Sequence, residues 1–162
     1  MTISVGDRLP AATFLQMGAN GPEPVELAPR LAGHKLVIFA IPAAYSGTCT
    51  SAHVPSFIRT RAQFLAKGVA EIICVAVNDP YVMKAWGEST GATAAGITML
   101  SDADGSFAKA LGLSFTNPAT GLYDRSRRYS MLVEDGVVKV LQREVKGGTC
   151  EISGGEALLA AI

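Results

Sequence analysis

The sequence predicts an α/β domain in which helices flank a mixed central sheet and the chain ends in a hairpin and a helix. Apolar runs rich in β-branched residues, typical of buried strands, alternate with segments of helical periodicity. These runs are Lys35–Ile41, Glu71–Asn78 and Ile97–Ser101. A later segment, Arg128–Leu141, is predicted to fold back on itself at Asp135-Gly136, because this dipeptide favours a tight hairpin turn. Parallel strands joined through helices and one antiparallel pair together make the sheet mixed.

The composition limits the class of protein. The 162 residues suffice for a sizeable core, and we expect residues 1–162 to form a single domain. Apolar residues make up 49% and charged residues 17%, with a formal net charge of zero, which argues against disorder and against nucleic-acid binding. The apolar runs are shorter than the roughly 20 residues of a membrane span, and the start shows no secretory signal. We therefore expect a cytoplasmic protein that has no membrane partner.

The first helix of the pattern follows the first strand. Glycine and proline punctuate residues 1–34, which we expect to be rich in loops. Helical periodicity then extends from Thr48 to Lys67, and Gly68 marks the end of the helix. The face of this helix that is expected to be buried consists of Val54, Ile58, Ala62 and Leu65.

Shorter helices complete the pattern. They are predicted over Pro80–Glu88 and Ser106–Leu111. Ser153 and Glu156 have the spacing of a capping box ahead of a final helix over Ala157–Ile162. A β-α-β start followed by a terminal hairpin and helix is the thioredoxin-like arrangement, and sites in such sheets lie beyond the carboxyl ends of the strands.

Cys49 occupies such a position. Pro42 ends the first apolar run, and Gly47 then favours a turn. Small hydroxyl residues nearby are candidates for helix capping; they are Ser46, Thr48, Thr50 and Ser51. In the first turn of a helix, unpaired backbone N–H groups and the helix dipole favour a thiolate over a thiol. We therefore expect Cys49 to be a reactant.

The segment around Cys49 resembles the peroxiredoxin active-site motif, Pro-x-x-x-Thr/Ser-x-x-Cys, at Pro42, Ser46 and Cys49. Three blocks resemble the type-five subfamily of peroxiredoxins and follow one another in its order. They are Tyr45–Pro55, Val77–Trp86 and Arg125–Gly136. The resemblance extends from Val5 to the last helix, and three collinear blocks are more specific than one short motif.

The resemblance implies a cofactor-free thiol peroxidase of thioredoxin-like fold. The Cys49 thiolate would attack hydrogen peroxide or an alkyl hydroperoxide and become a sulfenic acid. The family's arginine corresponds to Arg128, which would stabilise the transition state together with the Ser46 hydroxyl and the backbone N–H groups of Thr48 and Cys49. Pro42 would pack over the thiolate and shield it from water.

Three further residues are expected to contact the substrate, namely Thr48, Gly47 and Arg125. Arg125 is also expected to support Arg128, as an ion-pair partner or from behind it. The sequence departs from the usual family pattern with Ser46 where threonine is common and Gly47 where proline is common. Both changes loosen the turn around the nucleophile, because serine lacks the stiffness of a β-branched side chain.

His53 follows Cys49 by four residues and would share its helix face. A base is one interpretation of His53, and a structural, hydrogen-bonded histidine is the more common one. Three cysteines without a C-x-x-C pair and two histidines do not match the spacings of metal sites, so we expect no metal. Arg127 directly precedes Arg128, so on a strand it should face the opposite way, into solvent.

The recycling of the sulfenic acid leaves alternatives. Cys150 lies in a polar, glycine-rich loop before the final helix, and the resemblance implies that it resolves Cys49 through an intramolecular disulfide. Cys74 lies inside a buried apolar run, where a cysteine is usually inert, although plant relatives make a resolving role conceivable. If neither cysteine resolves Cys49, the protein would be a one-cysteine peroxidase recycled by glutathione or glutaredoxin. The expected reductants are thioredoxin, glutaredoxin or glutathione.

Other classes of function stay open or are disfavoured. A disulfide oxidoreductase is disfavoured by the missing C-x-x-C, whereas a redox sensor or holdase would need the same reactive thiolate. We also expect a homodimer, with Tyr45, Trp86 and Phe115 as candidates for its interface near the active site. Packing in the core explains Trp86 equally well.

Overall fold

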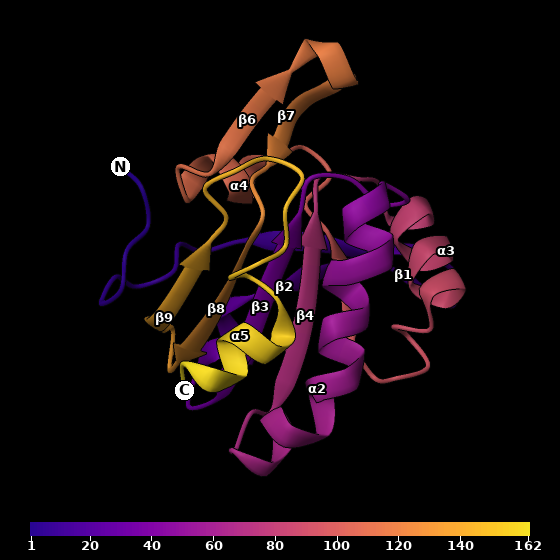
Figure 1. Ribbon diagram of the computed structural model, residues 1–162. Coiled ribbons are helices and arrows are strands. Elements are labelled where there is room, and N and C mark those ends of the chain that lie inside the picture. Colours follow the sequence, from indigo (N-terminus) through magenta and orange to yellow (C-terminus); the bar gives the residue numbers. More distant parts are fainter.

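A mixed sheet forms the centre of the computed structural model, which describes residues 1–162 (Figure 1). Three parallel strands occupy its middle: β3 (Lys35–Ile41), β4 (Glu71–Ala76) and β5 (Thr98–Ser101). All three were predicted, and they are buried along nearly their whole length, which explains their continuous apolar sequences. Their carboxyl ends meet at one edge of the sheet.

Antiparallel strands extend the sheet on both sides. Next to β3 lie β8 (Tyr129–Glu134) and then β9 (Val137–Arg143), which form the predicted hairpin. Its turn residues Asp135 and Gly136 have positive φ angles of 48° and 79°, as a tight hairpin turn requires. Because β8 runs antiparallel to β3, the beginning of β8 lies at the same edge as the end of β3.

The expectation of loops over residues 1–34 was wrong. This segment contains β1 (Thr13–Gly18) and β2 (Gly21–Glu26), an antiparallel pair joined to β5 through β1, followed by the short helix α1 (Ala28–Leu31). The full strand order is therefore β2-β1-β5-β4-β3-β8-β9. Pro22 and Pro24 argued against a strand here when the sequence was considered alone. An edge strand tolerates proline, however, because one side of it makes no backbone hydrogen bonds to a neighbouring strand.

Helices cover both faces of the sheet (Figure 1). On one face, α1 and α4 (Ser106–Ala110) close a core that contains Phe107 and Leu31. On the other face lie α2 (Val54–Ala66), α3 (Pro80–Thr90) and α5 (Gly155–Ala160). The mixed sheet thus lies between two layers of helices, and the chain ends in a hairpin and a helix. This confirms the predicted α/β architecture.

A second, two-stranded sheet stands beyond the carboxyl edge of the main sheet (Figure 1). It consists of β6 (Ser114–Asn117) and β7 (Leu122–Ser126), joined by a 3₁₀ turn, η2 (Pro118–Thr120). No element was predicted for this segment. Its strands are short, mostly polar and partly exposed, so they carry no strong pattern.

The helix expected from Thr48 to Lys67 has two parts. It begins with a π-helical turn, η1 (Cys49–His53), and continues as α2. Pro55 has no N–H to donate to the Ser51 carbonyl, and the turn closes instead through the wider bond from Val54 N–H to the Cys49 carbonyl.

The predicted buried face of α2 was wrong in part. Val54 is buried and Ile58 packs against the core, as expected, but Ala62 and Leu65 are exposed. The buried stripe instead continues through Phe57, Thr60 and Phe64. Two phenylalanines, which bury the most apolar surface, thus set the face that packs against the sheet.

Two sequence expectations outside the site are decided by side-chain contacts. Ser153 does not cap α5: the residue before this helix is Gly154, and the Ser153 hydroxyl donates to Glu144 instead. Trp86, on α3, is fully buried, and its Nε1–H donates to Thr50 Oγ1 at 3.0 Å, so of its two interpretations the structure supports core packing.

Candidate active site

Cys49 begins the π-helical turn η1, directly above the carboxyl end of β3, and its side chain is fully buried. The backbone N–H groups of Thr48 and Cys49 donate to no acceptor within the protein. In the first turn of a helix these groups have no carbonyl one turn earlier to bind. Two unpaired donors therefore point out of the same turn that carries the thiol, as an anion-binding site requires.

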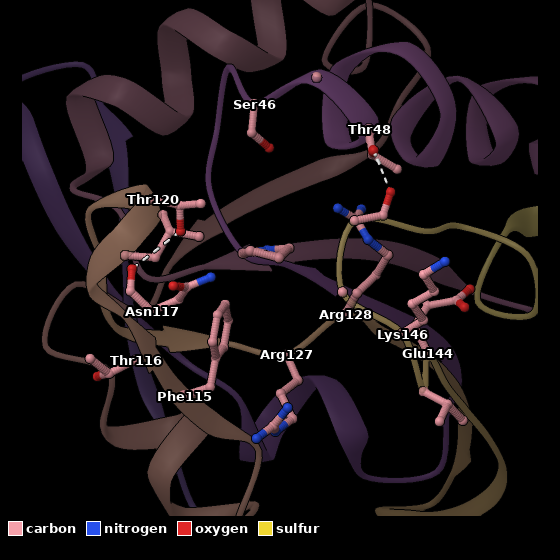
Figure 2. Close-up of a pocket in the computed structure, with 16 residues that line it drawn as sticks. Ser46, Thr48, Phe115, Thr116, Asn117, Thr120, Arg127, Arg128, Glu144 and Lys146 are labelled. Carbon is pink, nitrogen blue, oxygen red and sulfur yellow. Dashed lines mark hydrogen bonds between the residues drawn. The ribbon is translucent and has the colours of Figure 1, made fainter.

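The expected capping by small hydroxyl residues was wrong. No side chain caps the turn: the Ser46 hydroxyl donates to the Ala43 carbonyl at 2.8 Å. The Thr48 hydroxyl donates to the carbonyl of Gly148, in the loop that carries Cys150, also at 2.8 Å (Figure 2). Ser46 thus stabilises the turn after Pro42, and Thr48 joins the nucleophile's turn to a distant loop.

Arg128 lies next to the Cys49 sulfur. It directly precedes β8, whose beginning meets the end of β3, and its Nη2 donates to Cys49 Sγ at 3.0 Å. Its side chain is only 6% exposed, so solvent screens the charge little. A guanidinium stays protonated at any physiological pH, so the sulfur of Cys49 lies beside a fixed positive charge.

His53 holds the other side of the guanidinium. Its Nδ1 lies 3.0 Å from Arg128 Nη1, and its Nε2 lies 2.9 Å from the Ser153 carbonyl oxygen. A carbonyl only accepts, so Nε2 carries the proton and Nδ1 accepts from Arg128. Burial, and then the nearby Arg128 charge, lower the pKa of His53 to about 3, which keeps the ring neutral.

This geometry answers the open question about His53. The lone pair of Nδ1 is engaged by Arg128, so His53 is not available as a base. It instead fixes the orientation of the arginine that contacts Cys49, a role that the sequence analysis did not assign. Its four-residue spacing from Cys49 was the only signal in the sequence.

The expectation that Arg125 supports Arg128 was wrong. It lies on β7, and its Nη1 donates to the Val77 carbonyl at 2.8 Å, which ties the small sheet to the loop after β4. Arg127 is exposed, as predicted, and its guanidinium lies 5.6 Å from the centre of the Phe115 ring.

A cleft of about 820 Å³ opens over the buried thiol. Figure 2 shows Phe115 and Asn117 of the β6–η2–β7 segment on one side and Glu144 and Lys146 on the other, with Arg128 between them. Pro42, Ser46, Gly47 and Thr48 also line the cleft, whereas Arg125 does not. Cys49 lies behind this lining, so a substrate must pass Pro42 and Arg128 to reach its sulfur.

The three thiols are free and differ in their surroundings. Cys74 is fully buried in the centre of β4, and burial, together with the nearby Cys49, raises its pKa. Cys150 is half-buried in the loop between β9 and α5. Burial raises the pKa of Cys150, and the Ser153 hydroxyl and the charge of Arg128 oppose this rise. The charge of Arg128 thus acts on the pKa of the Cys150 thiol as well.

Other kinds of site have little support in the fold. No three His, Cys, Asp or Glu side chains converge on a point where they could hold a metal ion. The helices are all too short or too polar to cross a membrane.

Known proteins share both the sequence and the fold of this chain. The family described as Redoxin matches residues 4–159. The chloroplastic peroxiredoxin-2E-2 of Oryza sativa subsp. japonica is 44% identical over 165 residues, which cover 99% of this chain and 73% of the relative. Reduced Prx3 from Vibrio vulnificus in complex with hydrogen peroxide has a TM-score of 0.90 and 43% identity over 99% of both chains. Peroxiredoxin 5 from Alvinella pompejana has a TM-score of 0.84 and 30% identity over 98% of this chain and 97% of its own.

These similarities, together with a buried thiol beside an arginine on a thioredoxin-like fold, define the class of protein as a thiol-dependent peroxidase. The chain belongs to the peroxiredoxin family. The predicted fold and enzyme class are thereby confirmed, whereas the homodimer and the cytoplasmic location stay predictions.

Proposed function

We propose that Cys49 is the nucleophile of this peroxidase and that Arg128 and the backbone N–H groups of Thr48 and Cys49 stabilise its transition state. The observation that carries the proposal is the 3.0 Å contact between Arg128 Nη2 and Cys49 Sγ, beside two unpaired N–H donors. The thiolate attacks one peroxide oxygen, the O–O bond breaks, and the other oxygen leaves as hydroxide or alkoxide and takes up a proton. The donors and the guanidinium bind the developing negative charge.

The remaining residues around Cys49 have supporting roles. Pro42 lines the cleft in front of the thiol and limits the access of water. Ser46 and Gly47 form the wall of the cleft before η1, where the peroxide enters. The Ser46 hydroxyl, which donates to the Ala43 carbonyl, retains its lone pairs and reaches the substrate only by rotating.

Cys150 is our choice for the resolving thiol, and with it we propose that the chain is of the type-five subfamily. Cys150 lies on a loop that can move without disturbing the sheet, whereas Cys74 lies within β4, between β3 and β5. The Cys150 thiol would attack the Cys49 sulfenic sulfur; the S–O bond would break and water would leave as the disulfide forms. A dithiol reductant of the thioredoxin type would then reduce the disulfide.

Cysteine variants test this cycle. We expect non-reducing digestion and mass spectrometry to find a link between Cys49 and Cys150 in peroxide-treated wild type and in Cys74→Ser. Cys150→Ser should stop at the Cys49 sulfenic acid and lose turnover with a dithiol reductant, while Cys49→Ser should consume no peroxide. Undiminished turnover of Cys150→Ser with thioredoxin would contradict the resolving role. Stoichiometric consumption without turnover, with thioredoxin, glutaredoxin and glutathione alike, would favour a redox sensor instead.

A further inference from the structure

A single carboxylate organises the loop that carries Cys150. Glu144 follows β9, and its Oε1 accepts three backbone N–H groups: from Glu151 at 2.7 Å, Ile152 at 2.8 Å and Ser153 at 2.9 Å. The Ser153 hydroxyl donates to the same oxygen at 2.9 Å, and the Thr149 hydroxyl shares its proton between Oε2 at 3.2 Å and the Lys146 carbonyl at 2.7 Å. These donors come from the residues on both sides of Cys150. The bend that presents the thiol therefore closes around one side chain.

No cation balances the charge of Glu144. It is absent from the ion pairs of the protein, so the loop's own N–H and O–H groups bind its carboxylate. Hydrogen bonds to an ionised acceptor are roughly twice as strong as neutral ones. Partial burial would raise the pKa of Glu144, but the donors from Ser153, Ile152 and Glu151 together lower it. The loop is thus shaped to bind the ionised form.

The start of the loop is fixed beside the active-site arginine. The backbone N–H of Glu144 donates to the Arg128 carbonyl at 3.2 Å, as a continuation of the β8–β9 pairing. The backbone of Glu144, from which the carboxylate extends, is therefore fixed to the main sheet. Its position relative to Arg128, and through Arg128 to Cys49, is set by the main chain.

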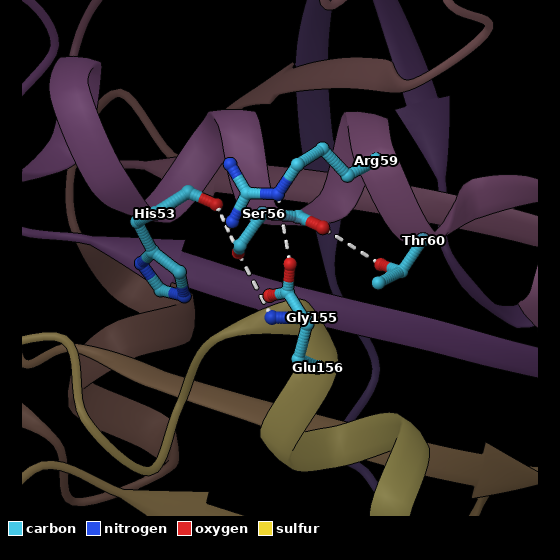
Figure 3. Close-up of polar contacts among 6 residues, drawn as sticks. All are labelled: His53, Ser56, Arg59, Thr60, Gly155 and Glu156. Carbon is cyan, nitrogen blue, oxygen red and sulfur yellow. Dashed lines mark hydrogen bonds and ion pairs between the residues drawn. The ribbon is translucent and has the colours of Figure 1, made fainter.

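The far side of the loop contacts the segment that carries the nucleophile. The Thr48 hydroxyl donates to the Gly148 carbonyl, and His53 Nε2–H donates to the Ser153 carbonyl. Figure 3 shows the third contact, in which the backbone N–H of Gly155 donates to Ser56 Oγ at 2.8 Å. These acceptors and donors span residues 48 to 56, so the loop lies along the turn of Cys49.

We propose that Glu144 is the positioning residue for the resolution step. Its carboxylate folds residues 149–153 so that the Cys150 thiol is held near Cys49 before the peroxide arrives. Holding two reacting groups together lowers the entropic part of the barrier, so the Cys150 thiol attacks the Cys49 sulfenic acid faster than from an unconstrained loop. This inference rests on the proposed resolving role of Cys150.

The test separates the two chemical steps in time. After mixing the reduced protein with hydrogen peroxide, rapid acid quench, alkylation and mass spectrometry follow the Cys49 sulfenic acid and the disulfide between Cys49 and Cys150. We expect Glu144→Ala to slow disulfide formation about 10-fold. Glu144→Gln keeps an acceptor oxygen without the charge and should restore part of the rate.

Two internal controls distinguish positioning from general damage. Sulfenic acid formation should slow less than disulfide formation in the Glu144 variants, because Arg128 and the free N–H groups keep their places. Glu151→Gln is the matched control: Glu151 lies on the same loop, and its carboxylate receives no hydrogen bond. Its disulfide should form at the wild-type rate.

The outcomes that overturn the inference are distinct. If wild type forms the disulfide and Glu144→Ala forms it as fast as Glu151→Gln does, Glu144 does not position Cys150. Equal slowing of both steps in Glu144→Ala would also overturn it, because the effect would then be on the whole site. If wild type forms no disulfide between Cys49 and Cys150, the proposed resolving role fails, and the role of Glu144 fails with it.

Discussion

Cys49 and Cys150 have surroundings that are built in different ways. Cys49 is fully buried, and its neighbours Arg128 and His53 come from the start of β8 and from η1, which pack in the core. Cys150 is half-buried on a loop whose bend closes around the side chain of Glu144. The first environment is a property of the sheet and helix packing, and the second depends on one carboxylate.

The difference suits the two thiols to different tasks. A nucleophile needs fixed donors and a fixed charge, which a core supplies because its side chains interdigitate with few voids. A resolving thiol must approach another residue and later withdraw, which a loop allows because few buried contacts hold it. The two environments meet at hydrogen bonds that include the one from His53 Nε2–H to the Ser153 carbonyl and the one from the Thr48 hydroxyl to the Gly148 carbonyl. Three experiments test how separate they are.

The largest effect is expected at Arg128. Arg128→Lys keeps a positive charge but loses the planar fork that contacts Cys49 Sγ and His53 Nδ1 together. We expect kcat/KM for hydrogen peroxide to fall about 100-fold, as when one transition-state donor is removed. Single-turnover stopped-flow measurements would check this. Arg127→Lys, which changes the exposed neighbouring arginine, should stay within about 3-fold.

An intermediate effect is expected at His53, from two variants that split its contacts. Asparagine places its amide oxygen near the position of Nδ1, so His53→Asn retains an acceptor for Arg128 but loses the bond to Ser153. His53→Gln reaches the position of Nε2 and retains the bond to Ser153 instead. We expect His53→Gln to slow sulfenic acid formation about 10-fold, since a hydrogen bond to a charged group is lost.

The same pair of variants shows whether the two environments are separate. His53→Asn should leave the rate of sulfenic acid formation nearly unchanged, because Arg128 keeps an acceptor. Equal loss in both variants would indicate that His53 is needed only for packing, and the comparison between the two regions would lose its basis.

The third effect concerns the pH dependence of stability. His53 has its pKa lowered to about 3 in the folded protein, whereas an unfolded histidine titrates near 6.5. Below pH 6.5 the unfolded state therefore binds a proton that the folded state does not, so the free energy of unfolding falls as the pH falls. The free energy of unfolding changes by at most about 1.4 kcal/mol per pH unit through this group. Above pH 6.5 the stabilising contribution of the neutral His53 is fully present.

Urea unfolding of the reduced protein between pH 7 and pH 5 would measure this slope. His53→Asn should lack the component from His53 and show a shallower dependence. His34→Asn, at the exposed second histidine, is the control and should behave as wild type. A slope that is the same in His53→Asn and wild type would show that His53 is not the buried neutral group that the geometry describes.

Much of the fold was predictable because its signals are local. Strands β3, β4 and β5 are recognisable in the sequence as continuous apolar runs. The dipeptide Asp135-Gly136 predicts the hairpin turn, because both residues adopt positive φ angles readily. The β1–β2 and β6–β7 pairs escaped prediction, because prolines and short polar strands carry weak patterns. The buried face of α2 was predicted only in part, since Phe57 and Phe64, and not Ala62 and Leu65, pack into the core.

The sequence by itself determined that Cys49 stands at a strand-to-helix turn, and the resemblance to peroxiredoxins pointed to Arg128 as its partner. The tertiary structure decided what surrounds them: His53 on the guanidinium, Arg125 away from it, and Glu144 beneath the Cys150 loop. The physical reason is distance along the chain. A turn or a strand depends on neighbouring residues, whereas the bonds from Arg128 to His53 and from His53 to Ser153 join positions that only the folding of the sheet brings together.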